Sequence, residues 1–145
     1  MHRKAFFELF TAVTFHKQVL DIDPPAETER IVKTMRDGVR KVMRRQGCVV
    51  GISGGVDSSV ALGLCVRAFG PDRVIAIMMP DQDSNPDSEA LAQRVAAHYG
   101  VTPILENITA ALQGFACYPR HDDAIRRVVP EYEASLGYKA KIVLP

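Results

Sequence analysis

A glycine- and serine-rich loop between an apolar strand and a helix constrains this chain more than any other feature. The sequence reads Gly51-Ile52-Ser53-Gly54-Gly55-Val56-Asp57-Ser58-Ser59, directly after the apolar run Cys48 to Val50. Glycine reaches backbone angles that are closed to other residues, so Gly54 and Gly55 can bring amide N–H groups close to an anion. The helix that follows adds unpaired N–H groups and the positive end of its dipole. The loop is therefore suited to hold phosphate.

The polar side chains of the loop fit the same ligand. Ser53, Ser58 and Ser59 add hydroxyl donors, and Asp57 adds a carboxylate suited to the Mg²⁺ that accompanies a nucleotide. The Walker loop G-x-x-x-x-G-K-[ST] is excluded, because this segment has no lysine, and the dinucleotide pattern G-x-G-x-x-G is absent too. What remains is a lysine-free S-G-G-x-D-S-S loop.

Two other interpretations of the loop stay open. The stretch from Gly51 to Gly55 also satisfies G-x-S-x-G, the nucleophile elbow of serine hydrolases, for which His98 or His121 would have to serve as the base. The elbow gives no reason for Asp57-Ser58-Ser59, and an α/β-hydrolase sheet is difficult to complete in 145 residues. The second alternative is a glycine-rich turn without function.

Apolar residues at helical spacing predict three helices around this loop. Their inner residues are, in chain order, Ile31, Met35, Val39 and Val42, with Val32 and Met43 widening the stripe; Val56, Val60 and Leu64, with Ala61, Cys65 and Ala68 beside them; and Leu91, Val95 and Tyr99. The first helix is expected to follow Asp23-Pro24-Pro25 and to end at Gly47, and the second to end at Gly70. The third is expected to begin at an Asn85 cap followed by proline and to end at Gly100.

Strands are predicted at Cys48 to Ile52, at Val74 to Met79 and at about Pro103 to Ile108, with a short helix from Thr109. The second is a continuous apolar run, as expected of a parallel strand that is covered on both faces, so Met78 and Met79 are predicted to lie in the core. Cys65, on the broad apolar face of the preceding helix, is predicted to lie in the core as well. The alternation of strands and helices predicts an α/β fold, Rossmann-like, with a parallel sheet, right-handed crossovers and helices on both faces.

The predicted topology places two loops at one edge of the sheet. In open parallel sheets, ligands bind outside the carboxyl ends of the strands. The loops from Ser53 to Ser59 and from Pro80 to Ser84 both leave the sheet at that edge. Topology and loop composition therefore indicate the same binding region.

Composition excludes several classes of protein. The chain of 145 residues is 47% hydrophobic with a net charge of +1, which fits one domain and provides no strong field for nucleic acid or an anionic membrane. No apolar run approaches the ~20 residues needed to span a bilayer. One helix flank is basic, and a solvated surface is favoured there over RNA binding; its residues are Lys33, Arg36, Arg40, Lys41, Arg44 and Arg45.

The ends of the chain and its cysteines carry weaker signals. Residues 1–22 are expected to form an N-terminal arm or helix, because Glu8 interrupts the apolar stretch that a secretion signal would need. The three cysteines are far apart and form no C-x-x-C pair, so neither a disulfide framework nor a zinc knuckle is indicated. A reducing cytoplasm fits this pattern best.

The loop resembles a known signature. Ser53-Gly54-Gly55-Val56-Asp57-Ser58-Ser59 is similar to the pyrophosphate-binding loop of the PP-loop ATP pyrophosphatases, which have the adenine nucleotide alpha hydrolase-like fold. Within them, Arg73 to Pro80, followed by Ser84 and by Asp87-Ser88-Glu89-Ala90-Leu91-Ala92, resembles NAD synthetases, as do Phe15 to Leu20 and Glu27 to Ile31. The resemblance covers roughly residues 14–110 and leaves Tyr118 to Pro145 unplaced.

The resemblance implies ATP-dependent amidation of deamido-NAD. In that reaction the nicotinate carboxylate attacks the α-phosphate, pyrophosphate leaves, and ammonia displaces AMP from the acyl-adenylate. It implies a cytoplasmic homodimer that uses ATP, Mg²⁺, deamido-NAD and ammonia, with Asp57 on the metal and Met79 against adenosine. The implied nucleotide-binding residues are Gly51, Ile52, Ser53, Gly54, Gly55, Val56, Asp57, Ser58, Ser59 and Met79, and no catalytic residue is assigned.

The family also has site residues farther along the chain than Pro145. Residues 23–145 are therefore expected to form an ATP-pyrophosphatase domain that is incomplete at its C-terminal end and carries the pyrophosphate half of the site. Other PP-loop enzymes share the signature, namely tRNA thiolation enzymes, for which Cys117 is the candidate cysteine, and the ATPase part of GMP synthetase. A noncatalytic nucleotide-binding module is the remaining alternative.

Overall fold

The computed structural model describes residues 17–136 of the chain. Most of the N-terminal arm expected at residues 1–22 lies outside the described residues, and only one 3₁₀ turn, Lys17–Leu20, is described there. The boundary between an arm and a following domain therefore stays a prediction.

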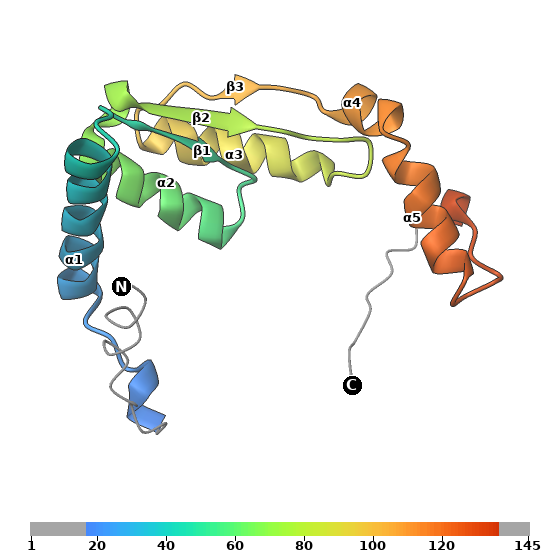
Figure 1. The fold of residues 1–145 in the computed structure, drawn as a ribbon, viewed down its shortest axis with the longest axis horizontal. Helices are drawn as coiled ribbons and strands as arrows, with labels where there is room; N and C mark the ends of the chain where they lie inside the picture. Colours follow the sequence, from blue (N-terminus) through green and yellow to red (C-terminus); the bar gives the residue numbers. More distant parts are fainter. Residues whose placement is uncertain (1–16, 137–145) are drawn as a thin grey trace, which may run out of the picture.

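Helices and strands alternate along the chain, as Figure 1 shows. In chain order the elements are α1 (Pro24–Asp37), the π-helical turn η2 (Gly38–Val42), β1 (Cys48–Gly51), α2 (Val56–Phe69), the 3₁₀ turn η3 (Pro71–Arg73), β2 (Val74–Met78), α3 (Pro86–His98), β3 (Ile104–Leu105), α4 (Thr109–Gly114), α5 (Cys117–Arg126) and the 3₁₀ turn η4 (Ala134–Leu136). The helix expected from Thr109 is confirmed, and α5 lies in the segment that the sequence left unplaced.

The three strands form a parallel sheet in the order β1-β2-β3. Cys48 pairs with Val74 at one end of the sheet, and Ile77 pairs with Ile104 between the second and third strands. The predicted α/β class with a parallel sheet is confirmed. The third strand is shorter than the predicted stretch from Pro103 to Ile108, although the Ile108 amide still donates to the Pro80 carbonyl at 3.0 Å.

Only one face of this sheet is covered by helices in the described part of the chain, so the expectation of helices on both faces is wrong there. Both crossovers step in the same direction across the sheet, which places α2 and α3 on the same face when the connections are right-handed (Figure 1). Ile75 on the opposite face is 49% exposed, and Val49 and Ile104 are exposed beside it. A crossover in the other direction would place a helix on that face, and residues 17–136 contain none.

The core lies between the covered face of the sheet and helices α2 and α3. Alternate residues of β2 point into it, so Val74, Ala76 and Met78 are buried. Its remaining members are Val32, Ile52, Leu62, Cys65, Ala68, Phe69, Ala92, Ala96 and Val101. The core positions predicted for Cys65 and Met78 are confirmed, whereas Met79 is 52% exposed and follows the strand rather than belonging to it.

The inner face of α2 differs from the prediction. Val56 and Val60 are exposed, Val56 by 75%, while the buried line runs through Leu62, Cys65 and Phe69. The helix is apolar on most of its surface, so several stripes at helical spacing were available and the spacing alone did not select among them. The strand that the helix covers decides which stripe is buried.

The inner faces of α1 and α3 were also only partly predicted. Val32 is the buried residue of α1, with Met35 and Val39 packed against the core, whereas Val42 is 80% exposed. The chain widens into a π-helical turn at η2, where the Met43 amide donates to the Gly38 carbonyl, and this turn carries Val42 off the inner face.

The helical segment that begins with α1 ends before Gly47, because Arg44 adopts a left-handed backbone angle with φ of 54°. In α3, the small residues Ala92 and Ala96 are the buried ones, and Leu91 is exposed. The predicted start and end of α3 are confirmed. The Asn85 side chain accepts from the amide of the helix's second residue, and Gly100 follows the helix with φ of 70°.

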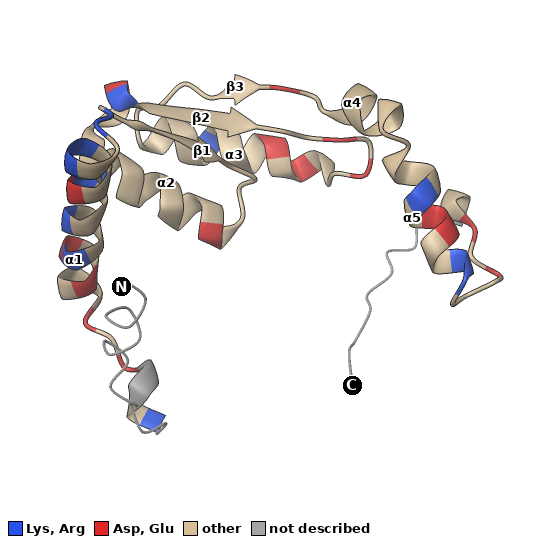
Figure 2. Ribbon diagram, viewed as in Figure 1, with Lys and Arg blue, Asp and Glu red and all other residues tan. Residues whose placement is uncertain are grey.

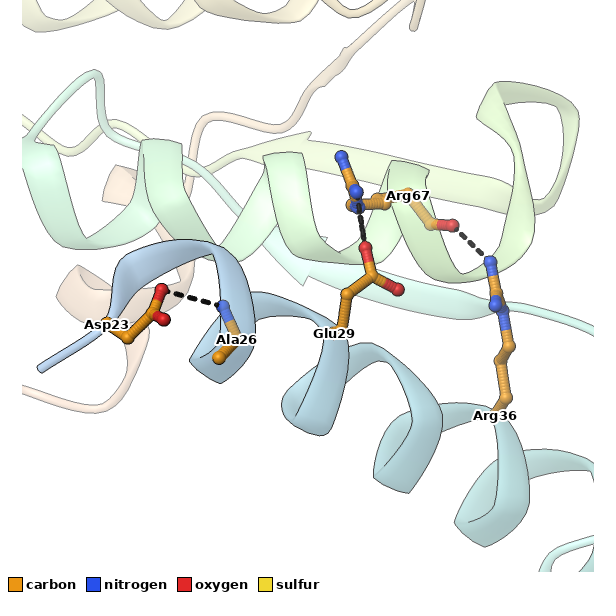
Figure 3. A network of polar contacts seen from close by, with 5 residues as sticks. All are labelled: Asp23, Ala26, Glu29, Arg36 and Arg67. Carbon is orange, nitrogen blue, oxygen red and sulfur yellow. Dashed lines mark hydrogen bonds and ion pairs between the residues drawn. The ribbon is translucent and has the colours of Figure 1, made fainter.

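Two arginine contacts fasten α1 to the far end of α2 (Figure 3). The Arg36 guanidinium donates to the Arg67 carbonyl at 2.7 Å and to the Ala68 carbonyl at 2.9 Å. These carbonyls belong to the last turn of α2, which has no further helical partners for them. The Arg67 side chain pairs in turn with Glu29 of α1. Part of the basic flank of α1 thus serves packing within the chain.

Replacing Arg36 by alanine should lower the free energy of unfolding by about 1–2 kcal/mol. The variant leaves two carbonyls of α2 without a charged donor, and such bonds contribute more than neutral ones, although partial exposure reduces their worth. Urea unfolding measures the change. Arg40→Ala is the matched control, because Arg40 is an exposed arginine nearby, and we expect a change below about 0.5 kcal/mol. Equal losses in both variants would contradict the assigned role.

Cys65 should resist alkylation in the folded protein. Burial raises the pKa of the Cys65 thiol to about 12, and the neighbouring Cys48 thiol adds to the effect. Only about one molecule in 10⁴ then carries the reactive thiolate at pH 8. Peptide mass spectrometry after iodoacetamide treatment should find Cys117, which is only partly buried, modified long before Cys65, and urea should abolish the difference. Similar rates without urea would contradict the burial of Cys65.

No helix within residues 17–136 is both long enough and apolar enough to cross a bilayer.

Candidate functional site

The predicted loop lies at the carboxyl edge of the sheet, where β1 ends and α2 begins (Figure 1). Gly51 is the last residue of β1, and the buried Ile52 continues the pairing through its amide, which donates to the Ile77 carbonyl at 2.9 Å. Ser53 to Gly55 form the turn, and Val56 to Ser59 form the first turn of α2. All the predicted loop residues are thus brought together at one strand-to-helix junction.

Gly54 is the position at which the loop requires glycine. Its φ is 77°, a left-handed angle that side chains disfavour. A Cβ on Gly54 would lie 2.5 Å from the Leu91 Cβ and 2.8 Å from the Ala92 amide nitrogen, because the loop passes directly over α3. Gly55 has an ordinary extended conformation, with φ of −72°, so the expectation that both glycines need special backbone angles holds only for Gly54.

The serine hydroxyls hold the turn in shape. The Ser58 hydroxyl donates to the Gly55 carbonyl at 3.0 Å and accepts from the Ser53 amide at 3.2 Å. The Ser59 hydroxyl donates to the same carbonyl at 2.8 Å, and the Ser53 hydroxyl lies 3.3 Å from that of Ser58. Each hydroxyl can rotate to another acceptor without moving the backbone, so these serines can both shape the turn and donate to a bound anion.

The start of α2 offers amide groups to an anion. Gly55 is the N-cap residue, and since glycine has no side chain, no side-chain hydrogen bond caps the helix there. The amides of the first turn and the positive end of the helix dipole therefore point toward the site. Asp57, which is exposed, stands in the same turn and is the acidic residue at the start of α2 in Figure 2.

A cavity of about 280 Å³ opens beside this loop. Its walls come from Ile52 and Ser53 on the loop side, from the end of β2, from the first turns of α3 and from Asn107 after β3. Met79 forms part of the cavity wall and lies next to Gly51. The strand end at which Met79 was expected to contact adenosine therefore borders the cavity. None of the residues that line the cavity is lysine or arginine, and Asp81 and Glu89 make part of its surface acidic.

Asp81 organises the rim of the cavity. Its carboxylate accepts from the Ser84 hydroxyl at 2.7 Å and from the Tyr118 hydroxyl of α5 at 3.3 Å. The Ser84 bond lowers the pKa of the Asp81 carboxyl below its usual value, and the Tyr118 bond acts in the same direction. Partial burial and the Asp81 charge raise the pKa of Tyr118. Helix α5 is thereby tied to the loop that follows β2.

The hydrolase interpretation finds no support in the described residues. The Ser53 hydroxyl contacts Ser58 and the Gly55 amide rather than a histidine. His98 lies in the last turn of α3, at the opposite end of that helix from the cavity, where its ring packs edge-on against Tyr99. His121 lies on α5 and contacts the neighbouring Asp122. Among residues 17–136, Ser53 therefore has no histidine in contact that could serve as the base of a nucleophile elbow.

Several residues of the site were missed from the sequence. The loop after β2 was expected at this edge, but the separate roles of Asp81 and Ser84, and the place of Glu89 in the cavity wall, were not. The place of Asn107 could have been predicted, because a polar residue directly after the third strand must lie at the same edge of the sheet. The contact of Tyr118 with Asp81 could not have been predicted, since nothing in its local sequence indicates what α5 packs against.

Comparison with known proteins agrees with this geometry. Residues 27–130 match the family model described as NAD synthase. The chain belongs to the NAD synthase family. The NH(3)-dependent NAD(+) synthetase of Mesorhizobium japonicum is 48% identical over 126 residues, which is 87% of this chain and 39% of that protein. The one from Methanocaldococcus jannaschii is 41% identical over 86 residues, covering 59% of this chain and 33% of its own length.

Solved structures of an NAD synthetase and of an NMN synthetase have the same fold. An NH3-dependent NAD synthetase from Campylobacter jejuni superposes with a TM-score of 0.59 and 32% identity, covering 66% of this chain and 41% of that one. The NMN synthetase from Francisella tularensis superposes with a TM-score of 0.61, at 23% identity, covering 70% and 41% of the two chains. The chain spans about two fifths of the length of two curated NAD synthase relatives. The same two matches cover most of this chain.

Proposed function

We propose that this chain carries the ATP-binding half of an enzyme that amidates deamido-NAD with ammonia. The nicotinate carboxylate attacks the α-phosphate of ATP, pyrophosphate leaves, and ammonia then displaces AMP from the acyl-adenylate to give NAD. Membership of the NAD synthase family supports this reaction. The structural observation that supports it best is a helix N-terminus without a side-chain cap, directly after a turn that is held open by Gly54.

The role proposed for the loop from Ser53 to Ser59 is to hold the departing pyrophosphate. The amides of the first turn of α2 and the three serine hydroxyls are donors that can point toward its oxygens. Hydrogen bonds to charged oxygens contribute about 1.5–3 kcal/mol each. Because charge accumulates on the leaving group as the bond to the α-phosphate breaks, donors placed there favour the transition state over bound ATP.

The cavity beside the loop is the proposed place of the adenosine. Met79 and Pro80 provide apolar surface at the end of β2, and Ile52 connects the cavity to the loop. At about 280 Å³ the cavity is at the small end of the range for ligand pockets, and the triphosphate is proposed to extend from it toward the loop. The arrangement therefore suits a nucleotide that lies across the ends of β1 and β2.

Asp57 is the proposed ligand of Mg²⁺. Within residues 17–136 no cluster of three or more histidine, cysteine, aspartate or glutamate side chains could hold a metal ion alone. A single carboxylate fits Mg²⁺ nevertheless, because this ion commonly takes one or two carboxylates together with water and substrate phosphates. When bound, the metal neutralises phosphate charge. A cytoplasmic location is proposed from the cysteine pattern, and a homodimeric assembly from the family resemblance.

Product analysis tests the reaction. ATP, Mg²⁺ and ammonia are incubated with the protein and with deamido-NAD, xanthylate or tRNA in parallel, and AMP and pyrophosphate are quantified. Release of both products in equal amounts only with deamido-NAD is the expected result. Release with xanthylate or with tRNA would move the chain to one of the other PP-loop activities. Binding of ATP without release for any acceptor is the outcome expected of a half-site that holds the nucleotide but lacks the rest of the machinery, and it would leave a noncatalytic nucleotide-binding module as the alternative to the ligase half.

A further inference from the structure

The cavity beside the phosphate loop has walls that are suited to one end of a nucleotide only. Asp81 and Glu89 are carboxylates in its surface, and none of the residues that line it is a cation. A phosphate group placed inside would face two negative charges without compensation. The neutral end of the nucleotide, its nucleoside, is the part that this cavity can accept.

Glu89 is the carboxylate with capacity for a ligand. Asp81 is engaged more fully, because its two oxygens accept from Ser84 and Tyr118 and the backbone amides of Asp81 and Asp83 also act on them. Glu89 stands in the first turns of α3, where the Asn85 cap fixes the start of the helix, and its Oε1 accepts from the side chain of Gln93 at 3.1 Å. An ionised carboxylate has about four acceptor sites and donates nothing, so Glu89 can satisfy only hydrogen-bond donors of a ligand.

A nucleoside presents two kinds of neutral donor, which are the ribose hydroxyls and an exocyclic amino group. Resting on the proposed placement of ATP, we propose that Glu89 accepts a hydrogen bond from such a donor and makes the cavity selective for the nucleoside. Glu89 is then a specificity-determining residue, and Asp81 is a positioning residue that holds the rim. Glu89 is half-buried in the free protein, and a ligand in the cavity would cover it further, so a ligand that lacks the matching donor would leave the carboxylate without a partner and bind more weakly.

The test measures binding of four ligands to the full chain with Mg²⁺ by isothermal titration calorimetry. Tripolyphosphate reports on the loop alone, ATP on the loop and the cavity, 2′-deoxy-ATP on the ribose contact, and purine riboside triphosphate on the amino contact. Wild-type protein should bind ATP more tightly than tripolyphosphate and should bind one of the two analogues about 10-fold more weakly than ATP. The analogue that loses affinity identifies the donor.

Glu89→Gln keeps an acceptor oxygen but loses the charge, so it should weaken ATP binding about 10-fold, leave tripolyphosphate binding unchanged and reduce the discrimination between ATP and the analogue. Unchanged tripolyphosphate binding also shows that the variant is folded. Gln93→Ala is the matched control, because it removes the helical partner of Glu89 and keeps the carboxylate, so all four affinities should stay at wild-type values. A loss in Gln93→Ala equal to that in Glu89→Gln would assign the effect to helix packing and overturn the proposal.

Two failures can be told apart. If wild-type protein binds neither tripolyphosphate nor ATP, the proposed function of the loop fails, and this inference fails with it. If tripolyphosphate and ATP bind, but Glu89→Gln keeps wild-type affinity for ATP, or neither analogue binds more weakly than ATP, the role of Glu89 alone is refuted.

Discussion

Gly54→Ala should destabilise the protein by about 2–5 kcal/mol and abolish nucleotide binding. An L-residue in the left-handed region costs about 1–2 kcal/mol, and overpacking adds about 1–3 kcal/mol. The added Cβ would overlap the Leu91 Cβ at 2.5 Å and the Ala92 amide at 2.8 Å, and neither is the mobile end of a side chain. Relief requires the loop to move away from α3, which displaces the donors at the start of α2. Urea unfolding and ATP titration measure the two effects.

Gly55→Ser is the matched control for this prediction. Gly55 has no unusual φ, and a Cβ there meets only the Ser53 hydroxyl at 3.5 Å. Serine is a somewhat better N-cap residue than glycine, so we expect stability within about 0.5 kcal/mol of wild type. If Gly54→Ala were as stable as Gly55→Ser, the close passage of the loop over α3 would be wrong.

Asp57→Ala should remove the Mg²⁺ dependence of ATP binding, with a loss of about 10- to 100-fold in affinity at saturating Mg²⁺. This range corresponds to the loss of one charge-assisted interaction with the bound cation. The free energy of unfolding should change by less than about 1 kcal/mol, because Asp57 is exposed and stabilises α2 only through the helix dipole. Calorimetric titration of ATP with Mg²⁺, and again with a chelator, measures the effect.

Two further variants sharpen the assignment of Asp57. Asp57→Asn keeps the shape and loses the charge, so it should behave like Asp57→Ala. Asp87→Asn is the control, because Asp87 is also an exposed aspartate in the first turn of a helix, and it should bind ATP as wild type does. Binding of ATP by Asp57→Ala with the full Mg²⁺ dependence of wild type would remove Asp57 from the metal site.

The sequence predicted the order and type of the elements around the site, because loop chemistry is local. The Asn85 cap, the glycine at position 100 and the strand before Gly51 each depend on a few neighbouring residues. Once the strands are known to be parallel, both loops must emerge at one edge. This is why the sequence alone predicted that the two loops meet at one edge of the sheet.

The faces of the helices and the walls of the cavity depend on tertiary contacts and were less accessible. α2 offers several apolar stripes, and only the sheet decides that Leu62 rather than Val60 is buried. Continuous hydrophobicity in β2 predicted cover on both faces, yet Ile75 is exposed because both crossovers run in the same direction. The contact between Asp81 and Tyr118 joins positions 37 residues apart, and no local pattern indicates it.

The most direct test of the account follows the backbone amides of the loop by NMR as Mg²⁺ and pyrophosphate are added. The account predicts that the largest chemical-shift changes fall on residues 53–59, with small changes at the far end of α2, and that Gly54→Ala abolishes them. Shifts that leave residues 53–59 unchanged, or that persist in full in Gly54→Ala, would contradict the claim that this turn holds the two outer phosphoryl groups of ATP.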